Sequence, residues 1–143
     1  MPAWVQSAYG EYAKRLPKEL SPELCEIPVA HRAKNYNVQD VKAAEGKAIL
    51  SAGKTSRLIT MDLAGKAWST PQLSQHVKQW QMQGDDLSFV IGGPDGLSDE
   101  CLKAASASWC LSNLTLPHPL VRVVFIEQLY RAWTILQNHP YHK

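Results

Sequence analysis

The chain has 143 residues, of which 45% are hydrophobic, and this suits one compact domain over residues 1–143 with a real core. The net charge is only +2, although residues 1–71 hold ten Lys and Arg against seven Asp and Glu, and residues 72–143 hold five against six. This modest excess excludes a protein that is held to nucleic acid by charge alone, so any RNA contact must be confined to patches.

The three cysteines, Cys25, Cys101 and Cys110, are odd in number and lack C-x-x-C spacing, which argues against a disulfide framework and a structural zinc site. We expect reduced, mostly buried thiols and no bound metal. No N-terminal signal pattern is present, and the longest uninterrupted apolar run, residues 123–126, is far shorter than a bilayer span. The sequence therefore predicts a cytoplasmic protein.

The chain opens with a predicted helix, because apolar residues recur at helical spacing from Trp4 to Leu16, where Pro17 ends the pattern. Chains that alternate strands and helices normally begin with a strand, so this start predicts that a first strand is missing from the sequence. Residues 24–27 then predict a short strand that Pro28 stops.

Residues 29–37 are predicted to form a mobile basic loop. His31, Arg32 and Lys34 stand beside Tyr36, and such groups can contact the phosphates and bases of RNA. A solvated surface loop explains the same composition. Asn37 is then placed to cap a helix that runs from Val38 to Gly53.

The middle of the chain predicts a strand over residues 57–63, whose end at Met61 and Asp62 runs into a turn. In open α/β sheets, ligands bind outside the carboxyl ends of the strands. Ser69 and Gln72 fit a capping box that opens a helix ending before Gly84. His76 lies next to the apolar stripe of this helix and is interpreted as a partly buried structural histidine, because no second metal-type residue has suitable spacing.

Residues 87–91 predict the next strand, which is followed at once by Gly-Gly-Pro-Asp-Gly at positions 92–96. Three glycines in five residues permit positive φ and a close approach of the backbone to a ligand. A tight strand-to-helix turn that simply needs glycine explains the same segment, which is neither a dinucleotide fingerprint nor a phosphate loop. Ser98 then caps a helix through Ala105.

The last part of the chain predicts a buried strand over residues 111–116, a rigid Pro117-His118-Pro119 turn, and a helix of about four turns from Leu120 to Leu136. The apolar face of this helix is wide, so part of it is expected to meet a second subunit; an ordinary core helix is the alternative. Tails are usually frayed, but residues 138–143 are rich in His, Tyr and Lys and are a candidate for closing an active site.

Several long motifs occur in order along nearly the whole chain: MPAWV at 1–5, EIP at 26–28, TPQL at 70–73, IGGPDG at 91–96, LTLPHPLVR at 114–122, EQLYRAW at 127–133 and NHPYHK at 138–143. With these motifs the chain resembles the RlmH family, the SPOUT-class methyltransferases of large-subunit ribosomal RNA. The resemblance implies an α/β fold of the SPOUT type, trefoil-knotted, with a mostly parallel sheet flanked by helices. It further implies S-adenosyl-L-methionine as the cofactor, bound in the knot, and a homodimer whose active site draws on both subunits. The implied reaction is methylation of N3 of a pseudouridine in 23S ribosomal RNA of the assembled ribosome, with no membrane and no DNA as partner.

By motif match, the resemblance also implies the residues of the site. The cofactor-binding positions are Met61, Gly92, Gly93, Ser112, Asn113, Leu114, Thr115, Leu116 and Pro117. The positions for catalysis and RNA handling are His118, Arg131, Tyr141, His142 and Lys143. The chain departs from the family pattern twice, because members begin with a strand before the MPxW segment and commonly carry Arg where Lys143 stands, a two-pronged donor in place of a point charge.

The chemistry of the residues agrees with the implied reaction. A sulfonium methyl is already electrophilic, so the enzyme chiefly has to align it with the target nitrogen, and such positioning lowers a barrier by about 7–11 kcal/mol. The N3 proton must still leave: His118 or His142 is able to accept it, or Arg131 to stabilise the anion, and the sequence does not choose. Two other functions stay open, a noncatalytic ribosome- or RNA-binding relative that has lost cofactor binding, and a nucleotide-binding enzyme of another α/β type.

Overall fold

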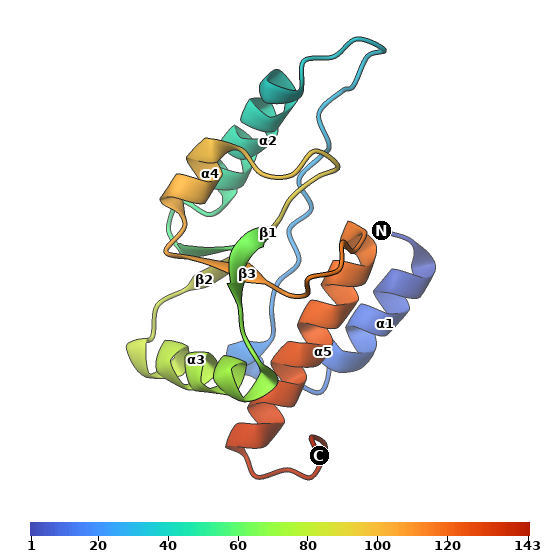
Figure 1. Ribbon diagram of the computed structural model, residues 1–143. Helices are drawn as coiled ribbons and strands as arrows, with labels where there is room; N and C mark the ends of the chain where they lie inside the picture. Colours follow the sequence, from blue (N-terminus) through green and yellow to red (C-terminus); the bar gives the residue numbers. More distant parts are fainter. The chain divides into compact units, whose positions relative to one another are not determined.

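The computed structural model describes residues 1–143, and the chain forms two compact units (Figure 1). Unit 1 consists of Met1–Leu24, Trp68–Gly84 and Leu114–Lys143, and unit 2 consists of Cys25–Ala67 and Asp85–Asn113. Each unit is therefore assembled from segments that lie far apart in the sequence.

Unit 2 is built on a three-stranded sheet in which all strands are parallel. Its strands are β1, Arg57–Ala67, β2, Leu87–Ile91, and β3, Ala107–Cys110, in the order β2-β1-β3. In the central strand, Ile59 and Thr60 point to opposite faces and are 1% and 0% exposed. Burial on both faces is typical of parallel sheets, and the predicted α/β class with a parallel sheet is confirmed.

Strand β1 is longer than the sequence predicts, because it pairs with β3 in two places. Met61 and Lys66 both lie in register with Trp109, so residues 62–65 form an irregularity between the two pairings. A Cβ on Gly65 would lie 2.7 Å from the carbonyl carbon of Ser108, so glycine is what lets β1 pass the backbone of β3 here.

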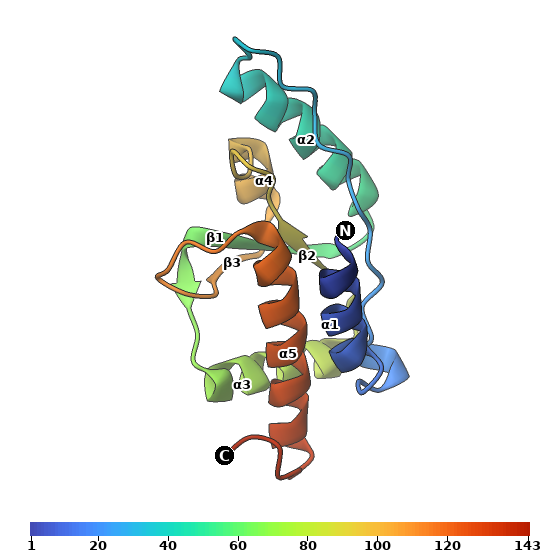
Figure 2. The same ribbon diagram turned by 90° about the vertical axis from the view of Figure 1, so that its right-hand side faces the viewer.

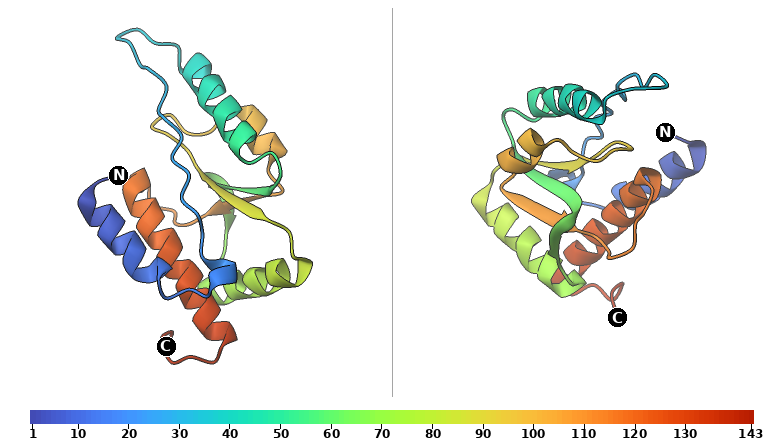
Figure 3. Two further views of the ribbon diagram at one scale, coloured as in Figure 1. Left: turned by 180° about the vertical axis from the view of Figure 1, so that it is seen from behind. Right: turned by 45° about the horizontal axis from the view of Figure 1, so that its top comes forward.

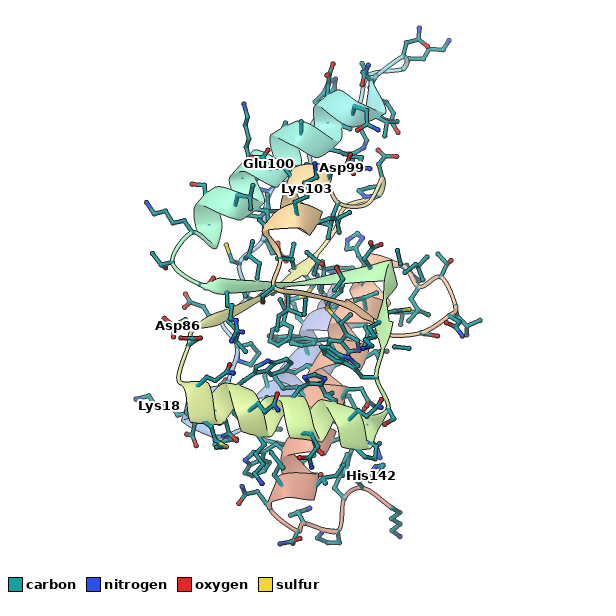
Figure 4. All side chains as sticks on the ribbon, turned by 60° about the vertical axis from the view of Figure 1, so that its left-hand side comes forward. Lys18, Asp86, Asp99, Glu100, Lys103 and His142 are labelled. Atoms are coloured by element: carbon teal, nitrogen blue, oxygen red, sulfur yellow. The ribbon has the colours of Figure 1, made fainter.

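Two helices complete unit 2: α2, Val38–Ala52, and α4, Asp99–Ala104. Their predicted caps are confirmed, since Asn37 accepts a hydrogen bond from the Asp40 amide and Ser98 accepts one from the Cys101 amide. Helix α4 packs on β1 and α2 packs on α4, on the same side of the sheet (Figure 3). The buried centre consists of Leu58, Val90, Leu97 and Cys101. Figure 4 shows Asp99 and Glu100 at the start of α4 and Lys103 near its end, which matches the helix dipole.

Unit 1 is a group of helices around its longest member. It contains α1, Ala3–Ala13, the 3₁₀ turn η1, Lys18–Leu20, α3, Thr70–Gln83, and α5, His118–Leu136. Helices α1 and α3 both pack on α5, and α1 runs beside α5 (Figure 2). Ile126, Ala132 and Thr134 of α5 are fully buried, so α5 is the core helix of this unit.

The start of α3 confirms the predicted capping box. The Ser69 hydroxyl accepts a hydrogen bond from the Gln72 amide, and the Gln72 side chain accepts one from the Ser69 amide. The helix ends at Gly84, which has the left-handed φ of 73° that glycine tolerates best.

Two predicted strands do not form. Residues 21–33 contain no helix or strand, because Pro22 and Pro28 each remove a backbone donor around a very short apolar run. Strand β3 ends at Cys110, whose partner Ala67 is the last residue of β1, so residues 111–116 have no ladder partner. Leu114, predicted to be buried there, is 71% exposed.

The thiols agree with the expectation of mostly buried cysteines, since Cys101 and Cys110 are buried, Cys25 is exposed, and all three are free. None of the helices has both the length and the apolar character that crossing a membrane requires.

Candidate functional site

The carboxyl ends of the three parallel strands lie at one edge of the sheet in unit 2. Met61 of β1 is in register with Ile91, the last residue of β2, and with Trp109 of β3. The residues that follow β2 and β3 therefore leave the sheet on the same side as Met61. This edge gathers five of the predicted cofactor positions: Met61, Gly92, Gly93, Ser112 and Asn113. In open parallel sheets it is the edge where ligands bind.

The segment after β2, here called the glycine turn and consisting of residues 92–96, has a shape that depends on its glycines. The Gly96 amide donates a hydrogen bond to the Gly93 carbonyl at 3.0 Å, and Gly96 has a φ of 84°. A Cβ on Gly92 would lie 3.0 Å from the Gly96 carbonyl carbon, and one on Gly93 would lie 3.1 Å from Glu45 Oε1. The turn is folded tightly on itself and against α2, and the absence of side chains at Gly92 and Gly93 is what allows this close packing.

A partly buried ion-pair network, the Arg32 cluster of Arg32, Glu45 and Asp95, lies against the glycine turn. Arg32 Nε donates to Asp95 Oδ2 at 2.9 Å, and Arg32 Nη1 donates to Glu45 Oε2 at 2.9 Å. Arg32 Nη2 also reaches Glu45 Oε1 at 3.3 Å, and the Ala30 amide donates to Glu45 Oε2 at 2.9 Å. The side chains of Arg32 and Glu45 are only 15% and 9% exposed.

The charges of the Arg32 cluster stabilise one another. Hydrogen bonds to Glu45 and then to Asp95 raise the pKa of Arg32. Burial by itself favours a higher pKa for Glu45, but the hydrogen bonds from Arg32 and from the Ala30 amide outweigh it, so the pKa of Glu45 lies below its ordinary value. Both groups are therefore charged at neutral pH, and neither is left without a partner inside the protein.

The structure shows further contacts of the basic segment 29–37, for which the sequence left RNA contact and a solvated surface loop as alternatives. Arg32 is bound to two carboxylates, and the Tyr36 hydroxyl donates to Asp95 at 3.2 Å while its ring lies 5.7 Å from the Arg32 guanidinium. Arg32 therefore makes its ion pairs within the protein. His31 and Lys34 of this segment are exposed.

In unit 1, the C-terminal tail folds back on α5 and forms a second network, the tail cluster of Glu127, Arg131, Tyr141 and His142. Arg131 donates to Glu127 Oε1 through Nε at 2.8 Å and Nη2 at 2.6 Å. The Tyr141 hydroxyl donates to the same oxygen at 3.1 Å, and the Arg131 guanidinium lies 4.8 Å from the Tyr141 ring centroid. Arg131 Nη1 is 3.2 Å from His142 Nδ1, and Figure 4 shows His142 on the tail beyond α5.

The tail cluster fixes the protonation of its members. Arginine can only donate, so His142 Nδ1 accepts, and a neutral His142 then carries its proton on Nε2. Burial, followed by hydrogen bonds with Tyr12 and Glu127, raises the pKa of Tyr141 to about 12, so Tyr141 is a neutral donor at physiological pH. The hydrogen bond to Glu127 raises the pKa of Arg131, which keeps its charge. The cluster therefore combines the permanent cation of Arg131 and the neutral donor Tyr141 with the Glu127 carboxylate that accepts hydrogen bonds from both.

The structure brings Arg131, Tyr141 and His142 together but not the other two predicted catalytic residues. His118 is the first residue of α5, and Lys143 ends the chain; both are exposed, and neither makes a hydrogen bond or ion pair. The remaining cofactor positions, Leu114, Thr115, Leu116 and Pro117, belong to unit 1.

Sequence reasoning missed Glu45, Asp95 and Glu127. Glu45 lies one turn after Val41 on the buried face of α2, and a carboxylate on an apolar helix face is a signal for a buried partner. Glu127 precedes Arg131 by four residues, the spacing of helical ion pairs. Asp95 gave no signal beyond its place in the glycine turn.

The interpretation of His76 as a structural residue is confirmed. Its ring stacks on Trp68 with centroids 4.0 Å apart and lies 5.8 Å from the ring of Trp80, and the side chain is partly buried. These aromatic contacts, all within unit 1, account for its position.

A parallel α/β sheet with glycines and polar residues at its carboxyl edge is typical of proteins that bind a small ligand there. A family model described as Predicted SPOUT methyltransferase matches residues 1–142, and the chain therefore belongs to the SPOUT methyltransferase family. It is a methyltransferase, and its methyl donor is S-adenosyl-L-methionine.

Three relatives are each named Ribosomal RNA large subunit methyltransferase H. The protein of Saccharophagus degradans is 60% identical over 144 aligned positions, which cover 100% of this chain and 93% of the relative. The protein of Teredinibacter turnerae is 57% identical, with 100% and 93% covered, and that of Hahella chejuensis is 53% identical, with 100% and 92% covered.

The residues at the strand edge fit this cofactor. Gly92 and Gly93 carry no side chain that would keep a ligand away from their backbone amides and carbonyls, groups that can bond the polar edge of an adenine ring or an amino-acid group. Ser112 and Asn113 add a hydroxyl and an amide. The Ser112 carbonyl is held by the Cys110 thiol, which donates to it at 3.0 Å, so the segment after β3 is fixed from its first residues.

Proposed function

We propose that this protein transfers a methyl group from S-adenosyl-L-methionine to N3 of a pseudouridine in 23S ribosomal RNA of the large subunit. The observation that supports the proposal is the position of Met61, the glycine turn and Ser112-Asn113 on or just after the carboxyl ends of the three parallel strands. The relatives named Ribosomal RNA large subunit methyltransferase H, 53–60% identical over the whole chain, support the substrate.

The cofactor, when bound, supplies a methyl group on a positively charged sulfur, which is already electrophilic. The task of the protein is therefore orientation. Backbone groups of the glycine turn and the side chains of Ser112 and Asn113 hold the cofactor, and good alignment lowers the barrier by about 7–11 kcal/mol.

Arg131 is the group that stabilises the N3 anion of the target base. Its charge is permanent, and Glu127 holds it through two hydrogen bonds. Tyr141, a neutral donor with a pKa of about 12, is able to hydrogen-bond the same base. His142 engages Arg131 through Nδ1, whereas the exposed ring of His118 makes no hydrogen bond and is the better acceptor for the N3 proton. Lys143 contributes an exposed charge for RNA phosphate.

We further propose a cytoplasmic homodimer in which the two units of each chain act as one domain, knotted as in the SPOUT family. The wide apolar face of α5, which the sequence assigned to this contact through Phe125, Leu129 and Trp133, is largely covered in the single chain, where Phe125 and Leu129 are both 5% exposed and Trp133 is partly buried. Trp4, Leu114 and Leu120 of unit 1 are 54%, 71% and 39% exposed, and they offer apolar surface for a second copy.

The direct test incubates the purified protein and methyl-labelled S-adenosyl-L-methionine with ribosomes from a strain that lacks the modification. Parallel reactions contain isolated large subunits, isolated small subunits and protein-free 23S RNA. We expect label in large-subunit RNA of assembled ribosomes and none in small subunits, with nuclease digestion and mass spectrometry placing it on pseudouridine N3.

Two results would contradict the proposal. Label on another atom or another RNA would refute the assigned target. Ribosome binding without transfer, in a protein that also fails to bind the cofactor in calorimetry, would show the noncatalytic relative that the sequence left open.

A further inference from the structure

The glycine turn makes few contacts of its own that fix its position relative to the rest of unit 2. Inside the turn there is one backbone hydrogen bond, from the Gly96 amide to the Gly93 carbonyl. Its single charged residue, Asp95, points to Arg32, which comes from a segment 63 positions earlier in the chain. The orientation of the turn therefore depends on groups outside it.

Arg32 joins the turn to the helix that supports it. One edge of the guanidinium, Nε, bonds Asp95 of the turn, and the terminal nitrogens bond both oxygens of Glu45 on α2. Glu45 in turn lies against the turn from the other side, since a Cβ on Gly93 would be 3.1 Å from its Oε1. The Tyr36 hydroxyl adds a second donor to Asp95 at 3.2 Å.

The arrangement of these hydrogen bonds depends on the planar shape of the arginine guanidinium group. A planar fork with five N–H donors can bond two carboxylates along two edges at once, which the single ammonium of lysine cannot do with the same fixed angles. These three side chains are also largely shielded from water, since Arg32, Glu45 and Asp95 are 15%, 9% and 21% exposed. The hydrogen bonds between them are therefore strong enough to set a loop position.

We propose that Arg32 is a positioning residue, which holds the glycine turn in the shape that receives S-adenosyl-L-methionine by bonding Asp95 and Glu45 simultaneously. This rests on the proposed placement of Gly92 and Gly93 in the cofactor site. Arg32 itself does not touch the cofactor. It acts by keeping the binding-competent turn populated, and the apparent dissociation constant rises as that population falls.

The test uses Asp95→Asn and Arg32→Lys, which keep the size of the side chains, because Arg32→Ala would leave two buried carboxylates unpaired and risks unfolding. The matched controls are Asp85→Asn and Arg57→Lys, which alter the other Arg–Asp pair of unit 2, an exposed pair at 3.4 Å outside the glycine turn. Four quantities are measured for each variant: the melting temperature without ligand, amide hydrogen exchange of residues 92–97 without ligand, the calorimetric dissociation constant of S-adenosyl-L-methionine, and kcat at saturating cofactor.

For both test variants we expect exchange of residues 92–97 and the dissociation constant to rise by about tenfold, since losing one charged hydrogen bond shifts a local equilibrium by about this factor. The kcat at saturating cofactor should stay near the wild-type value, because the substitutions are expected to change only the affinity for the cofactor. The control variants leave exchange in the turn and cofactor affinity unchanged.

Three results overturn the inference. Unchanged exchange in the turn together with unchanged affinity shows that Arg32 does not position it. Faster exchange with unchanged affinity shows that the turn is outside the cofactor site, and this separates failure of the site assignment from failure of the Arg32 contact. A wild-type protein that does not bind S-adenosyl-L-methionine removes both the inference and the function on which it rests.

Discussion

Charged side chains proposed to act in this protein have their ion-pair and hydrogen-bond partners within the same chain. Arg131 illustrates this at the tail, because Glu127 orients it while its guanidinium covers the Tyr141 ring and reaches His142. Two residues implied by the family resemblance, Arg131 and Tyr141, thus both donate to Glu127, which the resemblance had not singled out, and the third, His142, contacts Arg131.

The hydroxyl of Tyr141 is expected to matter more for the reaction than for stability. Tyr141→Phe loses the hydrogen bond to Glu127 but keeps the ring beneath Arg131, so the free energy of unfolding should fall by only about 1 kcal/mol. Methyl transfer to ribosomes should drop clearly, with unchanged cofactor affinity in calorimetry. Tyr9→Phe, in a partly buried tyrosine of α1, serves as the control. Wild-type transfer rates in Tyr141→Phe would show that the hydroxyl is not used.

Glu45 predicts a specific pH dependence of stability. Its pKa is lowered from 4.5 in the folded state, so the unfolded chain binds its proton first as the pH falls. The stabilisation it provides is therefore complete above about pH 4.5 and is lost as the pH drops through the lower folded-state value.

The measurement for Glu45 is urea unfolding of wild type and Glu45→Gln at several pH values. At pH 7 we expect the variant to be less stable than wild type, because Arg32 loses the charge of one of its two carboxylate partners. Below pH 4 the two curves should approach each other. A constant difference over the whole range would mean that Glu45 does not titrate with folding.

At the scale of elements, backbone contact decides which glycines are required. Gly65→Ala should be strongly destabilising, since the new Cβ would meet the Ser108 carbonyl carbon at 2.7 Å and the Trp109 amide nitrogen at 2.8 Å, and β3 must then shift. Gly10→Ala in α1 is the matched control, because nothing lies within 4 Å of its Cβ. It should stabilise by about 0.5–1 kcal/mol, the usual gain in a helix interior.

Thermal or urea unfolding of the two alanine variants separates these effects. Loss of stability in Gly65→Ala alone supports the two-part pairing of β1 with β3. Equal behaviour of the two variants would indicate that the strands separate at this irregularity in solution.

For the whole molecule, the central prediction is a site shared between subunits. A protein lacking residues 141–143 should bind cofactor but not transfer methyl groups, and Gly93→Val should lose cofactor binding. The valine also has to displace Glu45, because its Cβ would lie only 3.1 Å from Glu45 Oε1, so the melting temperature of this variant should fall as well.

Mixing these two proteins and isolating the heterodimer with two affinity tags gives the decisive sample. One of its two sites then combines an intact pocket with an intact tail, so about half of the wild-type activity should return. No recovery in a confirmed heterodimer would mean that each site uses its own tail. A monomer in light scattering at micromolar concentration would rule out the dimer itself.

The sequence by itself determined the local features: the caps at Asn37, Ser69 and Ser98, the limits of β2, and the helical stretch that ends at Leu136. Each of these features depends on contacts within about one turn of helix or on one run of apolar residues, and residues that are neighbours in the sequence specify such contacts. The ordered motifs likewise identified the family, because they span nearly the whole chain.

Only the tertiary structure decided where β3 ends, because a strand needs a partner, and β1 stops at Ala67 opposite Cys110. It also decided that Arg32 forms ion pairs within the chain, since the carboxylates that bind it lie 13 and 63 residues away. The gathering of Met61, the glycine turn and Ser112-Asn113 follows from strand order and register. Long-range pairing of this kind leaves no local pattern in a sequence, because the free energy that selects it comes from burying segments that meet only in the folded chain.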